Sequence, residues 1–119
     1  MTLTPLTQSR AEQIVRLGRL SVVSERDGDI HALSLHGELD LANAARLEDE
    51  LRRVEAGDAG VILVDLADVS FIDSTGIRAL ITAAARSRHD NRLVLQRASP
   101  VVLRVLRLTG VAPLLPLAG

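Results

Sequence analysis

Residues 71–76 read Phe71-Ile72-Asp73-Ser74-Thr75-Gly76, and they mark the change from a buried strand to an amphipathic helix. Before them, the continuous apolar run at residues 61–64 is typical of a strand buried on both faces. After them, apolar residues recur at helical spacing: Ile77, Leu80, Ile81 and Ala84. Ser74 and Thr75 then fall in the first helical turn, where unpaired N–H groups and the helix dipole favour negative charge. A phosphate added there is expected to be held at the helix end.

The same residues also fit a purely structural role. Ser, Thr and Asp are the preferred residues at helix N-termini, so an Asp-Ser-Thr sequence is commonly only a cap. The local residues leave both interpretations open. The rest of the sequence has to distinguish a capped helix from a functional site.

Composition limits the kinds of protein this chain can be. Its 119 residues suffice for one domain with its own core. The net charge is −1, there is one Phe and no Trp or Tyr, and no basic stripe is present, so direct nucleic-acid binding is not favoured. The absence of cysteine excludes disulfides, thiolate metal ligands and cysteine nucleophiles. The apolar runs are too short for a membrane span, and the first residues lack the pattern of a signal peptide. We therefore expect a cytoplasmic protein without membrane insertion.

The sequence divides into two parts. Residues 1–18 are expected to be an N-terminal extension, either a short helix or a mobile arm, and residues 19–119 the folded domain. The helix interpretation rests on a capping box from Ser9 to Glu12, followed by apolar residues at 14, 15 and 17. Gly18 is expected to end that helix.

The domain shows alternating strand and helix signals. Strands are predicted at residues 20–24 and 30–36 around the turn at 27–29, and at 61–66 and 93–96. Helices are predicted at about 42–55, from the 73–76 corner to about 88, and from Ser99-Pro100 to Gly110. Residues 111–117, with two prolines, favour an edge strand or an extended tail. This order predicts an α/β fold: an open, mostly parallel sheet of four to five strands with an antiparallel N-terminal hairpin and helices packed against it.

An enzymatic role is not favoured by the residues. Ser74 has no recognisable general base, because the three histidines, at 31, 36 and 89, are scattered along the sequence. His31 and His36 are five residues apart and would point to opposite faces of a regular strand. No glycine loop of the phosphate-cradling type is present. We therefore expect no intrinsic catalysis, no metal and no cofactor.

Three stretches together resemble the anti-sigma factor antagonist family, the bacterial form of the STAS domain. The first is Gly37-Glu38-Leu39-Asp40, followed at once by a helix. The second runs from Val64-Asp65-Leu66 into residues 71–77. The third is Ser99-Pro100-Val101-Val102, with residues 108–111 closing that helix. The order and spacing of these motifs over residues 20–112 make the resemblance specific.

The resemblance implies a switch rather than an enzyme. In that family the serine directly after the aspartate of the turn is the phosphoacceptor, which here is Ser74. The phosphorylating partner is an anti-sigma factor that is also an ATP-dependent serine kinase. The unmodified antagonist binds that partner and frees a sigma factor, the phosphorylated form cannot bind, and a metal-dependent serine phosphatase resets the cycle. A homodimer through a sheet edge is compatible with the sequence, which does not require one.

The resemblance also implies a set of partner-contacting residues: Asp40, Asp73, Thr75, Gly76 and Ile77. Asp73 would hold the turn, Gly76 would allow close backbone approach, and Thr75 adds a second hydroxyl as an alternative phosphate acceptor. Two of these have structural alternatives. Asp40 also fits the role of a helix cap. Ile77 fits a place in the core as well as it fits an exposed partner contact.

A different function from the same fold stays open. STAS domains also serve as subunits of lipid-transporting ABC systems and as scaffolds in stress-sensing assemblies, neither of which requires phosphorylation. A serine directly after Asp73 favours the switch. A neighbouring gene for a serine kinase or a sigma factor would support the switch, whereas one for an ABC ATPase or permease would support the transport subunit.

Overall fold

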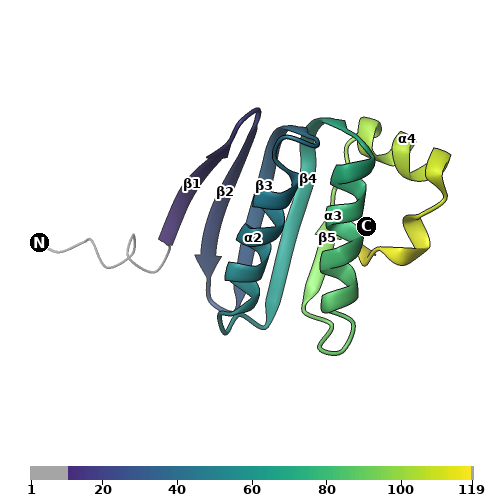
Figure 1. Cartoon of the computed structure of the whole chain (residues 1–119). Helices are drawn as coiled ribbons and strands as arrows, with labels where there is room; N and C mark the ends of the chain where they lie inside the picture. Colours follow the sequence, from purple (N-terminus) through teal and green to yellow (C-terminus); the bar gives the residue numbers. More distant parts are fainter. Residues whose placement is uncertain (1–10, 119) are drawn as a thin grey trace, which may run out of the picture.

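Six strands form one mixed sheet in the computed structural model, which describes residues 11–118. The strands lie in the order of the sequence (Figure 1): β1 (Ala11–Leu17), β2 (Leu20–Asp27), β3 (Ile30–Leu39), β4 (Val61–Ile72), β5 (Leu93–Gln96) and β6 (Leu117–Ala118). The pairs β1–β2 and β2–β3 are antiparallel, whereas β3–β4, β4–β5 and β5–β6 are parallel. The predicted α/β architecture with an antiparallel N-terminal hairpin is confirmed, but the sheet has six strands rather than four or five.

The segment before Gly18 is a strand, and its prediction as a short helix or arm was wrong for residues 11–17. β1 pairs with β2 along its whole length, from Ala11 opposite Arg26 to Leu17 opposite Leu20. Pairing turns Val15 and Leu17 toward the core, and this tertiary contact overrides a spacing that also fits a helix. Gly18, with φ +66°, opens the two-residue turn between the strands. Ser9 and Arg10 of the predicted capping box lie outside the described residues.

Two helices cover one face of the sheet. α2 (Ala44–Glu55) and α3 (Ser74–Arg86) lie side by side in front of the strands in Figure 1. The charged ends of the helices are joined by Arg86, whose Nε and Nη2 donate to the Glu55 carboxylate at 2.9 and 3.0 Å. The inward side chains of both helices complete the core: Ala44, Leu47, Leu51, Val54, Ile77, Ala79, Leu80, Ala83 and Ala84.

β4 continues to Ile72, six residues beyond its predicted end. Its pairing with β3 slips twice, between Ser34 and His36 and between Gly37 and Glu38, with an extra β4 residue each time. Each extra residue moves the inward side chain by one position, and the buried positions run Ile62, Val64, Leu66, Val69 and Ile72. The strand therefore reaches the start of α3, although its alternation breaks after Leu66.

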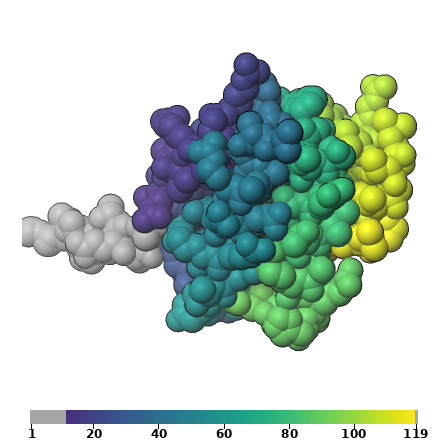
Figure 2. All heavy atoms as spheres, in the orientation of Figure 1, coloured from purple at the N-terminus to yellow at the C-terminus, as the bar shows by residue number. Residues whose placement is uncertain are grey.

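α4 (Pro100–Thr109) packs against β4 through its cap. The buried Ser99 accepts a hydrogen bond from the N–H of Val102 at 3.3 Å and donates to the carbonyl oxygen of Val69 at 2.7 Å. The helix ends at Gly110, as predicted. The chain then forms a single 3-10 turn, η1 (Ala112–Leu114), before the short edge strand β6. β1 and this C-terminal segment lie at opposite ends of the molecule (Figure 2).

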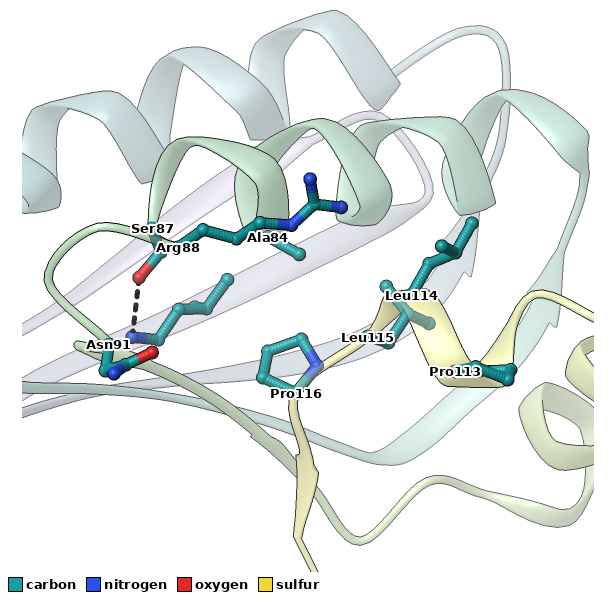
Figure 3. A pocket seen from close by; sticks show the side chains of 9 residues that line it. Ala84, Ser87, Arg88, Asn91, Pro113, Leu114, Leu115 and Pro116 are labelled. Carbon is teal, nitrogen blue, oxygen red and sulfur yellow. Dashed lines mark hydrogen bonds between the residues drawn. The ribbon is translucent and has the colours of Figure 1, made fainter.

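One hollow of the surface lies at the C-terminal end of α3. Figure 3 shows a pocket of about 200 Å³ at this end of α3, between Ser87 and residues 113–116. There the Ser87 hydroxyl accepts a hydrogen bond from the N–H of Leu93 at 3.0 Å. Because α3 has 13 residues, this pocket is about 20 Å from Ser74. No helix within residues 11–118 has the length and apolarity needed to cross a bilayer.

Candidate functional site

Asp73 closes the first turn of α3. Its Oδ1 accepts hydrogen bonds from the backbone N–H of Thr75 at 2.9 Å and of Gly76 at 3.1 Å, and a short one from the Thr75 hydroxyl. Its backbone is extended, with φ −112° and ψ −173°, as expected for a residue that precedes a helix. The carboxylate therefore satisfies two of the N–H groups that a helix start leaves unpaired.

Asp73 also ties this turn to the end of β3. Its N–H donates to the carbonyl oxygen of Leu39 at 3.3 Å, and its Oδ2 accepts from the N–H of Leu41 at 3.3 Å. Asp40 lies between these two partners, so the structure brings it to the start of α3. The residue is not the cap of α2, because the cap position is occupied by Asn43. The Asp40 carboxylate instead accepts from the N–H of Ala42 at 3.0 Å.

Asn43 is a supporting residue that the sequence interpretation did not single out. It is 1% exposed. Its Oδ1 accepts from the N–H of Asp40 at 3.0 Å, and its Nδ2 donates to the carbonyl oxygen of Glu38 at 2.8 Å. The side chain thus fixes the loop that carries Asp40. An asparagine at the start of the helix predicted at about 42–55 was the available signal, although such a residue usually caps the helix itself.

Ser74 and Thr75 have different environments. Ser74 is the first residue of α3 and is exposed, and its hydroxyl has no hydrogen-bond partner among residues 11–118. Thr75 is partly buried, and its hydroxyl donates to Asp73. Ser74 therefore offers an accessible nucleophilic oxygen, whereas the Thr75 oxygen is engaged in the cap.

The surroundings of a phosphate at the start of α3 differ from those that the sequence predicted. The N–H groups of Thr75 and Gly76, which were expected to hold a phosphate, already bind the Asp73 carboxylate. Partial burial raises the pKa of Asp73, but hydrogen bonds from the Thr75 hydroxyl and from backbone N–H groups outweigh it and leave that pKa below its usual value. A phosphate on Ser74 would therefore lie outside the cap, beside an ionised carboxylate.

The low pKa of Asp73 predicts a pH-dependent contribution to stability. The ionised carboxylate stabilises the folded chain above the ordinary aspartate pKa of about 3.9, and this contribution is lost as the pH falls through the lower folded value. Asp73→Asn keeps a cap acceptor but cannot titrate. We expect the wild type to unfold at higher temperature at neutral pH and this advantage to shrink in acid. Circular dichroism melts of both proteins from pH 7 to 3 measure it, and parallel pH curves would contradict it.

Gly76 and Ile77 belong to the packing beneath the site. A Cβ on Gly76 would lie 2.7 Å from Leu39 Cγ and 2.9 Å from Ile72 Cγ1, so only glycine lets α3 approach the end of β3 this closely. The predicted close backbone approach is thus found within the chain. Ile77 is 5% exposed and part of the core. Its prediction as an exposed partner contact was wrong, and its alternative as a core residue is confirmed.

Two exposed apolar residues close to Asp73, one bonded to it through its backbone and one two residues before it, were also missed. Leu41 is 77% exposed, and its N–H binds Asp73. Phe71, the single aromatic residue, is 46% exposed because the second register shift turns it away from the core. Apolar residues that match neither the strand nor the helix period were the available signal. We call the surface formed by Asp40, Leu41, Phe71, Asp73 and Ser74 the serine corner.

The fold and the serine corner together define a small α/β domain with an exposed serine at a carboxylate-capped helix start. A family model described as the STAS domain matches residues 21–118 of the sequence. The chain therefore belongs to the STAS domain family, as its motifs indicated.

The comparisons also identify individual relatives. The anti-sigma-B factor antagonist of Listeria monocytogenes is 29% identical over 94 residues, which cover 78% of this chain and 82% of that protein. An anti-sigma factor antagonist from Mycobacterium paratuberculosis has a crystal structure with a TM-score of 0.73 and 24% identity, covering 82% of this chain and 84% of that one. The phosphorylated form of the Bacillus cell fate determinant SpoIIAA gives a TM-score of 0.57 at 21% identity, covering 92% of each chain. At these identities the two solved structures establish the shared fold alone.

Proposed function

We propose that this protein is an anti-sigma factor antagonist whose binding is switched by phosphorylation of Ser74. The unmodified chain binds an anti-sigma factor that is also a serine kinase, and this binding releases a sigma factor in the cytoplasm. The kinase transfers a phosphoryl group from ATP to the Ser74 oxygen, with release of ADP and a proton, and the complex dissociates. A serine phosphatase restores the hydroxyl. The protein is a substrate and a binding partner, with no catalysis of its own and no contact with nucleic acid.

The exposed and unpartnered hydroxyl of Ser74 carries this proposal. It follows Asp73 in the chain, and the exposed residues Leu41 and Phe71 belong to the same corner. Exposed apolar residues of this kind are suited to burial against another protein. A phosphate adds about −1.5 to −2 charges. Such a charge beside an ionised carboxylate opposes the desolvation that binding requires.

The surroundings of the two hydroxyls favour Ser74 over Thr75 as the acceptor. Transfer to Thr75 would require its hydroxyl to leave the hydrogen bond with Asp73 and would weaken the cap of α3. Transfer to Ser74 breaks no hydrogen bond among residues 11–118. Phosphorylation at Ser74 therefore changes the surface and preserves the fold, which is what a reversible switch requires.

The relatives support the same assignment. The Listeria monocytogenes protein is named for antagonism of an anti-sigma factor, and the SpoIIAA structure is that of a phosphorylated form. Contacts to the partner are proposed at Asp40, Asp73 and Thr75, joined by Leu41 and Phe71. Gly76 is proposed to act through the packing that positions them.

A sigma-release assay tests the function. The protein is titrated into complexes of each sigma factor with its anti-sigma factor from the same genome, and free sigma factor is followed by size-exclusion chromatography. We expect release at close to equimolar antagonist from one complex, and no release after phosphorylation of the antagonist. If no complex releases its sigma factor, the antagonist assignment is wrong and a non-switching STAS subunit of a transport system or scaffold replaces it.

A further inference from the structure

The outer edge of β1 is a regular strand edge with a definite set of outward-facing residues. β1 is the outermost strand in Figure 1. Its two-residue turn makes Leu17 and Leu20 a hydrogen-bonded pair, and such pairs alternate along antiparallel strands. Val15 and Leu17 therefore direct their backbone groups toward β2. Glu12, Ile14 and Arg16 direct theirs away from the sheet.

The side chains of these outward-facing residues share one face. Val15 and Leu17 pack on the core, so Glu12, Ile14 and Arg16 lie on the opposite face, and all three are exposed. Ile14, at the centre, is 57% exposed. Natural edge strands are commonly protected by charged side chains, especially lysine, by proline or by inward charges, and β1 carries Glu12 and Arg16 of the first kind. β1 contains neither proline nor lysine, and it presents an isoleucine at its midpoint.

The charges of β1 are arranged for antiparallel pairing with an identical strand. When a second β1 is placed antiparallel about Ile14, the two isoleucines face each other and Glu12 of each copy faces Arg16 of the other. Each facing pair can exchange both backbone hydrogen bonds, because these are the residues whose N–H and C=O point outward. Opposite charges that face each other across strands are stabilising. A parallel arrangement would place like charges together and is disfavoured.

Among residues 11–118 the two charges have no ion-pair partner within the chain. Glu12 and Arg16 are four residues apart on a strand, which separates them by about 13 Å, too far for an ion pair. Neither forms an ion pair with another residue between 11 and 118. On β2, Glu12 faces Glu25, a residue of like charge.

We propose that two copies of this protein associate through β1, antiparallel about Ile14, to form one sheet that continues across both copies. β1 lies two positions from β3 and three positions from β4 in the sheet, and these two strands carry the serine corner. Each copy of the dimer therefore keeps its Ser74 accessible, and dimerisation is independent of the proposed switch.

Charge exchange at β1 tests this dimer. The full chain is examined by sedimentation velocity up to about 1 mM, with interference optics because it has no Trp or Tyr. We expect a concentration-dependent dimer for the wild type. Arg16→Glu alone, or Glu12→Arg alone, should raise the dissociation constant of the dimer at least about tenfold. The double variant E12R/R16E should regain the wild-type affinity, and an equimolar mixture of the two single variants should form heterodimers. A wild type that stays monomeric, or charge reversals without effect, would overturn the proposal.

Ile14→Pro provides a second test that does not depend on charge. The N–H of Ile14 points away from β2. Proline, which has no N–H, therefore leaves the β1–β2 hydrogen bonds in place at this position. We expect a folded monomer by circular dichroism and sedimentation. Val15→Pro, the control, removes an N–H that faces β2 and should lower the melting temperature. A persistent dimer of Ile14→Pro would place the interface elsewhere, whatever the outcome of the sigma-release assay.

Discussion

Ser74→Asp is expected to weaken binding to the cognate anti-sigma factor at least about 100-fold, since a like charge or an unpaired charge in an interface costs several kcal/mol. The added carboxylate would lie next to ionised Asp73, on the corner that also carries the exposed Leu41 and Phe71. The fold should be unaffected, because acidic residues are favourable in the first turn of a helix. Ser74→Ala should bind like the wild type. Isothermal titration calorimetry measures the affinities.

A matched charge elsewhere on α3 separates local repulsion from a general charge effect. Ala85 is exposed near the opposite end of the helix, about 16 Å along its axis from Ser74. Ala85→Asp adds the same charge and should leave the affinity unchanged. Binding of Ser74→Asp within about threefold of the wild type would refute the proposed repulsion.

Gly37→Ala is expected to lower the free energy of unfolding by about 3 kcal/mol, from strained backbone and overpacking together. Gly37 has φ +111°, and a Cβ there would lie 2.2 Å from the backbone carbonyl oxygen of Arg19. That oxygen is fixed, because it accepts a hydrogen bond from the N–H of Glu38 at 3.0 Å. Urea unfolding followed by circular dichroism gives the value.

Gly28→Ala is the control for this substitution. Gly28 also has a positive φ, +61°, but a Cβ there would have no heavy atom within 4 Å. It should lose only the conformational preference of glycine, about 1 kcal/mol. The difference between the two variants reports the contact with Arg19. Equal losses would mean that the turn at Arg19 moves to accept the methyl group.

Elements with strong local signals were predicted well. The strand at 93–96 matches β5, and the helix from Ser99-Pro100 to Gly110 matches α4. The ends of α4 are set by nearby residues: a serine cap, a proline at the first position and a glycine with positive φ. The corner at Asp73 was found for the same reason, because its cap is formed by residues next to it in the sequence.

Elements that depend on distant partners were predicted less well. Ile14, Val15 and Leu17 fit a helix as well as a strand, and only pairing with β2 distinguishes the two. The predicted strand ended at Leu66 because two extra residues in β4 interrupt the alternation of buried and exposed side chains. Their positions follow from the pairing of β4 with β3, which the sequence of β4 alone does not show. Ser99 donates hydrogen bonds to the carbonyl oxygens of Leu66 and Val69 in this stretch, although it lies 33 and 30 residues after them in the sequence.

The candidate site shows the same division. Ser74, Asp73 and Asp40 were identified from motifs, and the structure brings them together. Which apolar residues face outward depends on the loop after β3 and on the shifted end of β4, so Leu41 and Phe71 were missed. The sequence also left Ile77 equally open to an exposed contact and to the core, where the structure places it.

Phosphate transfer to Ser74 is the central claim, and mass spectrometry tests it most directly. The protein is incubated with ATP and each serine-kinase anti-sigma factor of the same genome, and the tryptic peptide of residues 54–78 is fragmented to distinguish Ser70, Ser74 and Thr75. The account predicts one phosphate, on Ser74, with loss of the complex between the two proteins. Phosphate on Ser70 or Thr75, or no phosphate with any of these kinases, would contradict it.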